Sequence, residues 1–156
     1  IVSAQEVDGI PAGLGARDIL RTEMGYPLHG QDISPTITPL EAKISWAIGW
    51  DKPEFAGKAS LSAARAQGVA RKRVALKALG RGIPRAHMDV YRDSELQDKI
   101  GEITSGTFSP TLKEGIALAL LDKEYEKSES VFIDVRGKSL ECAIVPLPFI
   151  SASPKS

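Results

Sequence analysis

The chain has 156 residues, enough for one ordinary domain or for a small domain with a piece of another. Its 20 basic residues balance 20 acidic ones, and no apolar run approaches the ~20 residues that a membrane-spanning helix needs. One cysteine, Cys142, and two histidines, His29 and His87, give little support to a disulfide, a metal site or a histidine-based triad. We therefore expect a soluble protein of a reducing compartment that binds no metal.

A helix is predicted over residues 16–24, where apolar side chains recur at helical spacing: Ala16, Ile19, Leu20 and Met24. Gly25 is the expected stop. On a helical wheel, Glu23 falls inside the apolar arc and Arg17 at its border. A carboxylate on a buried face is costly unless it is hydrogen-bonded or paired. Either the last turn frays and Glu23 is solvated, or Glu23 and Arg17 belong to a polar site beneath the helix.

Residues 38–41 predict a second helix start, with Thr as the N-cap residue, Pro at the first helical position and Glu at the third. That helix is expected to be short, and residues 45–50 to leave it as an extended segment. A further helix is predicted over residues 57–67, ending near Gly68.

From residue 69 onward the pattern changes to short strands, expected over residues 73–79, 88–91, 100–103, 116–121, 131–136 and 140–144. Short strands separated by frequent turns are typical of a small antiparallel barrel or sandwich. The predicted fold class is α+β and mainly β: a small antiparallel six-stranded barrel preceded by a helical remnant.

Residues 99–121 are predicted as strand, tight loop and strand. Small hydroxyl residues surround a glycine and a proline in the loop: Ser105, Gly106, Thr107, Ser109, Pro110 and Thr111. Glycine supplies positive φ, proline fixes φ and the hydroxyls bond nearby backbone groups, so this loop is expected to be rigid. It is either an ordered hairpin connection or a cavity loop that presents donors to a ligand, and spacing alone favours the first.

No acidic residue occurs between Glu54 and Asp89, where the basic residues are Lys58, Arg65, Arg71, Lys72, Arg73, Lys77, Arg81 and Arg85. This stretch is either a solvated face whose counter-charges lie elsewhere in space or a docking patch for an acidic partner. Nucleic acid is disfavoured because no aromatic residue interleaves the basic ones and the chain is neutral overall.

The motifs along the chain resemble the C-terminal part of the glycine cleavage system T protein, the aminomethyltransferase. The matching segments are residues 13–18, 20–23, 28–33, 38–41, 55–58, 82–85, 100–110 and 146–149. Each is weak alone, but together they cover nearly the whole chain in the expected order. The resemblance implies a longer parent protein whose domains surround a tetrahydrofolate-binding cavity. That protein takes the aminomethyl group from the lipoyl arm of H protein, releases ammonia and forms methylenetetrahydrofolate.

The resemblance also implies a division of the chain. Residues 1–50 would be the tail of the folate-binding domain, 51–68 a connecting helical segment, 69–150 the C-terminal barrel and 151–156 a tail. The family's catalytic aspartate and a pterin-binding glutamate lie in a region that this chain does not contain. No residue here is therefore expected to be catalytic, and the chain alone is expected to be inactive.

Arg17 matches the arginine of the family's Gly-Leu-x-Ala-Arg-Asp motif, a folate-site residue, and Glu23 is retained. The chain departs from the family at Thr22 and Met24, and its tail lacks a tyrosine that contributes in some members. We expect Arg17 to face the folate cavity, since a guanidinium offers a planar donor fork. Glu23 is expected to be buried and bonded either to Arg17 or to backbone groups of the 105–109 segment.

The resemblance implies lipoylated H protein as a partner, and neither nucleic acid nor membrane. The location would be the cytoplasm of a bacterium or the mitochondrial matrix of a eukaryote. Two alternatives remain open. One is the terminal folate-binding domains of a dimethylglycine- or sarcosine-type enzyme, which carries a flavin domain upstream. The other is a non-catalytic folate-binding module related to iron–sulfur maturation proteins, although their cysteine motif is not seen here.

Overall fold

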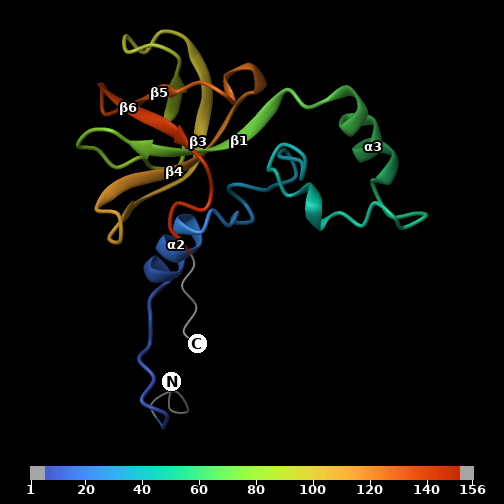
Figure 1. The fold of residues 1–156 in the computed structure, drawn as a ribbon, viewed down its shortest axis with the longest axis horizontal. Helices are drawn as coiled ribbons and strands as arrows, with labels where there is room; N and C mark the ends of the chain where they lie inside the picture. The colour runs from blue at the N-terminus through green and yellow to red at the C-terminus, as the bar shows by residue number, and fades with distance from the viewer. Residues whose placement is uncertain (1–5, 152–156) are drawn as a thin grey trace.

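The computed structural model describes residues 6–151, and its strands form one closed antiparallel barrel, from which the helix α3 (Lys58–Gln67) and the N-terminal segment extend (Figure 1). The strands are β1 (Arg71–Ala78), β2 (Asp89–Tyr91), β3 (Lys99–Ser109), β4 (Glu114–Asp122), β5 (Ser130–Val135) and β6 (Lys138–Val145). Around the barrel their order is β1-β4-β3-β2-β5-β6, and β6 pairs with β1 to close it. The structure therefore confirms the barrel prediction and excludes the open sandwich.

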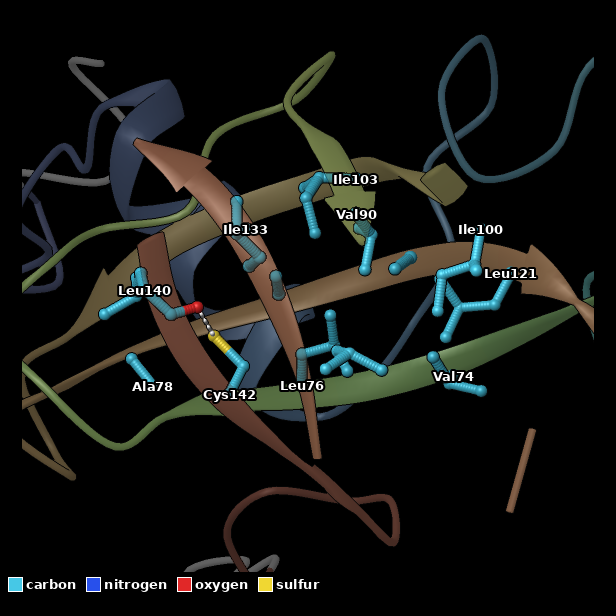
Figure 2. Close-up of a cluster of buried hydrophobic side chains, with 13 residues drawn as sticks. Val74, Leu76, Ala78, Val90, Ile100, Ile103, Leu121, Ile133, Leu140 and Cys142 are labelled. Atoms are coloured by element: carbon cyan, nitrogen blue, oxygen red, sulfur yellow. Dashed lines mark hydrogen bonds between the residues drawn. The ribbon is translucent and has the colours of Figure 1, made fainter. Parts of the chain in front are cut away.

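The barrel interior is filled by apolar side chains that alternate along the strands (Figure 2). Val131 and Ile133 on β5 and Leu140 and Cys142 on β6 are buried there, as their alternation predicted. Burial raises the pKa of the Cys142 thiol to about 12, so this cysteine is a neutral core residue.

β4 is buried on both of its faces, which explains its continuous apolar sequence. Ala117, Ala119 and Leu121 belong to the barrel core. The helix α2 (Leu14–Glu23) packs against the outside of β3 and β4, so the alternate residues of β4 are covered as well.

Two of the predicted helices are present. α2 ends just before Gly25, whose φ of 72° is the left-handed conformation expected of a helix stop. The other helix, α3 (Lys58–Gln67), lies between Gly57 and Gly68, which also have positive φ. No residue of α3 is buried, and the helix projects away from the barrel (Figure 1). No helix within the described part of the chain is long and apolar enough to cross a membrane.

The helix predicted to start at residues 38–41 is wrong, although its cap forms. The backbone N–H of Thr38 donates to the Glu41 carboxylate over 2.8 Å, and the Glu41 N–H donates to Thr38 Oγ1 over 3.3 Å. The segment remains a turn because Lys43 adopts a left-handed φ of 55°, which a helix cannot continue through. The extended segment predicted next is also wrong, since a short 3₁₀ helix, η1 (Ser45–Ala47), occupies it.

The loop predicted over residues 105–111 is wrong in its first half. Ser105, Gly106 and Thr107 lie within β3, which continues to Ser109 with a bulge near Ile103. A Cβ on Gly106 would lie 2.4 Å from the carbonyl oxygen of Pro84, so the glycine permits a close backbone approach inside a strand. The reversal itself occurs at residues 110–113.

Candidate functional site

A buried carboxylate, Asp32, joins the segment after α2 to the outer face of the barrel. Its Oδ1 accepts a hydrogen bond from Thr104 Oγ1 over 2.5 Å. Its Oδ2 accepts from Ser105 Oγ over 2.8 Å, from the Leu28 N–H over 2.8 Å and from Arg21 Nη1 over 2.7 Å. Only 1% of Asp32 is exposed, so these bonds compensate for the loss of water around the charge.

Arg21 links Asp32 to α2. Its guanidinium also donates to Asp18, from Nε over 2.8 Å and from Nη2 over 2.5 Å. Asp18 and Arg21 are three residues apart and therefore neighbours on the helix surface. The result is a chain of charges from the helix through Arg21 to the buried Asp32.

Glu23 is the second buried carboxylate beneath α2, with 1% of its surface exposed. Ser109 Oγ, at the end of β3, donates to Glu23 Oε1 over 2.5 Å and accepts from the Leu112 N–H over 3.1 Å. The expected burial is confirmed and the frayed, solvated alternative is wrong. The partner is the Ser109 side chain, rather than Arg17 or backbone groups of the segment.

Arg17 lies on a different side of α2 from Glu23. It is exposed, and it borders a shallow depression of about 420 Å³ with apolar side chains that include Leu20 and Met24. Within the described residues no ion pair joins Arg17 to Glu23. The structure therefore does not bring the two predicted site residues together, and the role of Arg17 in folate binding stays a prediction.

The remaining predicted site residues take different positions on β3. The hydroxyls of Ser105 and Ser109 are committed to Asp32 and Glu23. Gly106 packs against the backbone at Pro84, and the Thr107 hydroxyl makes only a long 3.5 Å bond to the Phe108 carbonyl. A ligand at Ser105 or Ser109 would have to displace a protein carboxylate.

Sequence reasoning missed Asp32 and Thr104 and did not assign Arg21 to the site. One available signal was the spacing of Ser105, Thr107 and Ser109, because hydroxyls at every second residue mark one face of a strand. Within the described ranges, no group of His, Cys, Asp and Glu side chains is arranged to hold a metal ion.

Two of the eight basic residues between Glu54 and Asp89 form ion pairs with carboxylates in the structure. Arg71 contacts Glu41 at 2.9 Å, and Lys77 contacts Glu114 at 3.2 Å. The Arg65 guanidinium lies 4.7 Å from the centre of the Trp50 ring. Counter-charges therefore lie elsewhere in space for Arg71 and Lys77, and the choice between a solvated face and a docking patch stays open for the stretch as a whole.

Glu41 supplies a pH-dependent part of this pairing. Burial raises the pKa of Glu41, but hydrogen bonds from Thr38 and Arg71 outweigh that effect and hold it below its ordinary value of 4.5. A carboxyl with a depressed pKa stabilises the folded state above its unfolded pKa, and the contribution is lost as the pH falls. We expect Glu41→Gln to lower the free energy of unfolding by about 1 kcal/mol at pH 7. Urea titrations should show this difference shrinking below about pH 4, and a pH-independent difference would contradict the expectation.

Large apolar side chains are exposed along the N-terminal segment and α2, namely Val7, Ile10, Leu14, Leu20 and Tyr26. An apolar surface is thus exposed near residues 10–24. Such a surface favours self-association. We expect light scattering to show an apparent mass that rises with concentration. Leu14→Gln with Leu20→Gln should suppress the rise, whereas Leu79→Gln, which changes a leucine 57% exposed after β1, should not. A constant monomer mass would contradict this.

The fold and these contacts define a β-barrel domain that carries a helix pinned to its outer face. The family model described as glycine cleavage T-protein C-terminal barrel domain matches residues 71–150, and the model described as GCVT N-terminal domain matches residues 1–52. The chain therefore belongs to the glycine cleavage T-protein family, as its motifs predicted.

Individual relatives agree with this assignment. A protein named aminomethyltransferase from Parafrankia sp. (strain EAN1pec) is 54% identical over 147 residues, which are 94% of this chain and 40% of the relative. An aminomethyltransferase from Mycobacterium bovis is 46% identical over 153 residues, or 97% of this chain and 41% of the relative.

The crystal structure of glycine cleavage system aminomethyltransferase T from Bartonella henselae is similar in fold, with a TM-score of 0.82 and 35% sequence identity. The similarity covers 89% of this chain and 39% of that one. The chain thus spans about two fifths of the length of the proteins it matches.

Proposed function

We propose that the chain is the C-terminal part of an aminomethyltransferase of the glycine cleavage system. The whole protein would transfer the aminomethyl carbon from the lipoyl arm of H protein to tetrahydrofolate with release of ammonia. The relatives named aminomethyltransferase support this activity over the dimethylglycine- and sarcosine-type alternatives. Because these relatives are bacterial, a bacterial cytoplasm is the proposed location.

For this chain's own residues, the proposal depends on the difference between the two sides of α2. One side is fixed to β3 through Asp32 and Glu23. The other side presents Arg17 on an open apolar surface beside Leu20. A helix fixed in this way holds its exposed arginine in a defined position, as a binding residue requires.

Arg17 would then bind folate through its planar donor fork, which suits both the edge of a pterin and a carboxylate. Glu23 would act indirectly, by holding the helix on the barrel. The catalytic aspartate and the other cavity walls would come from the part of the parent protein outside this chain. The chain alone is therefore proposed to be inactive.

The test uses the full-length parent enzyme with Arg17→Ala. Loss of a charged hydrogen bond should weaken tetrahydrofolate binding by about 1–3 kcal/mol, and the protein should remain folded. Arg81→Ala, which changes an exposed arginine after β1, is the matched control and should leave the affinity unchanged. An Arg17→Ala enzyme with wild-type folate affinity would overturn the role of Arg17. Ammonia release from aminomethylated H protein by the 156-residue chain alone would overturn its proposed inactivity.

A further inference from the structure

A cavity of about 400 Å³ opens where β1 and β6 separate. The two strands pair only from Ala75 to Ala78 of β1, so the earlier residues of β1 lack β6 as a neighbour. Residues 126–128 and Pro146 with Leu147 form other walls of the cavity. Its charged lining consists of Lys43, Arg73, Glu126 and Lys127.

Positive charge exceeds negative charge in this lining. Lys43 Nζ is paired with Glu126 Oε1 at 2.7 Å, which leaves Arg73 and Lys127 as the excess cations. The hydrogen bond from Lys43, reinforced by the charges of Lys43, Lys72 and Lys127, lowers the pKa of Glu126 despite its partial burial. The Glu126 carboxylate therefore stays ionised and paired with Lys43. The cavity lining as a whole is electropositive.

The buried Arg73 guanidinium has a donor without a hydrogen-bond partner among the residues described. Only 6% of the residue is exposed, and its Nη1 donates to the Gly25 carbonyl over 3.3 Å. Its Nε is buried without a hydrogen-bond partner among the residues described. Burial lowers the pKa of Arg73, while the charge of Asp32 opposes that effect. Buried donors are nearly always paired, so this guanidinium, which also lines the cavity, has hydrogen-bonding capacity that the described residues do not use.

Asp32 is not that acceptor. Its two oxygens are taken by Arg21, Leu28, Thr104 and Ser105. Arg73 therefore balances the charge of Asp32 from a distance, and a purely electrostatic role leaves its free Nε and the excess charge of Lys127 unexplained.

We propose that this cavity binds a small oxyanion, a carboxylate or a phosphate group, between Arg73 and Lys127. A guanidinium donates to such groups in a planar fork, and a lysine adds a mobile point charge. The proposal rests on this chain alone and does not depend on the aminomethyl-transfer activity.

The experiment follows the Arg73 Nε–H signal by NMR in the 156-residue chain labelled at its arginines. Inorganic phosphate and triglutamate are titrated separately at constant ionic strength, so that the two sources of an oxyanion are distinguished by their affinities. We expect a saturable shift of the Arg73 signal with at least one of them. Lys127→Gln should weaken that binding about tenfold, as for loss of one charged hydrogen bond.

Lys138→Gln is the matched control, because it removes the same charge at the opposite end of β6. It should leave the affinity unchanged. The absence of a saturable shift with both anions would overturn the proposal, as would equal weakening by Lys127→Gln and Lys138→Gln. A folded Arg73→Gln chain should bind neither anion. If that variant does not fold, the comparison of the two lysine variants still decides.

Discussion

Asp32→Ala is expected to lower the free energy of unfolding by about 3–5 kcal/mol, the usual cost of removing one partner from a buried ion pair. The substitution leaves the Arg21 guanidinium, which is only 11% exposed, with Asp18 as its remaining carboxylate, and it removes the carboxylate that the Thr104 and Ser105 hydroxyls bind. It also frees the Leu28 N–H, which orders the segment after α2. Domains of this size are stable by only about 5–15 kcal/mol, so the loss is a large fraction of the total.

Urea unfolding of the 156-residue chain measures this effect. Asp89→Ala is the matched control, because Asp89 also pairs with a cation, Lys99 at 2.6 Å, but on the surface. Exposed pairs contribute little, so this variant should stay within about 1 kcal/mol of the wild type. Similar losses of unfolding free energy in the two aspartate variants would show that the buried hydrogen bonds of Asp32 do not cause the destabilisation.

The barrel strands were predictable because each carries its own signal. The alternation of Val131 with Ile133 and of Leu140 with Cys142 is local, and the structure places all of them in one core. The order of the strands is not local. The pairing of β1 with β4 and of β2 with β5 joins segments far apart in the chain, and nothing in a single strand specifies its neighbour.

The site was predictable only in part, for the same reason. Helical spacing placed Glu23 on the buried side of α2, but its partner Ser109 is 86 residues away. Glycine, proline and hydroxyl residues together indicated a loop at residues 105–111, because turns favour these residue types. Ser105 and Ser109 are instead strand residues whose hydroxyls donate to carboxylates. One of these carboxylates, Asp32, is 73 residues from Ser105, and the local pattern does not reveal it.

The predicted helix cap at residues 38–41 likewise forms, although the helix that it predicted does not. Thr38 and Glu41 form the reciprocal cap that their sequence predicts. Yet Glu41 also pairs with Arg71 on β1, and its carbonyl accepts the Arg73 N–H over 2.8 Å. These tertiary contacts hold the segment against the barrel as a turn. They outweigh the local preference of the sequence for a helix.

Glu23→Ala is expected to lower the free energy of unfolding by about 2–3 kcal/mol, because it leaves the Ser109 hydroxyl without its acceptor in a buried site. The removed side chain also leaves a void between α2 and the barrel. Glu95→Ala, which removes an exposed carboxylate, should be nearly neutral. Urea unfolding gives these values.

A double-mutant cycle with Ser109→Ala separates the pair from its surroundings. If the Glu23–Ser109 bond holds the helix, the losses of unfolding free energy in the two single variants should add up to more than the loss in the double variant, by about 1 kcal/mol or more. Additive losses would mean that the two side chains act independently. Hydrogen exchange adds a local readout, because the Phe149 N–H donates to the Glu23 carbonyl over 2.9 Å. The substitution keeps that carbonyl, so faster exchange at Phe149, beyond the change at core amides such as Leu118, would show that α2 has loosened from the barrel.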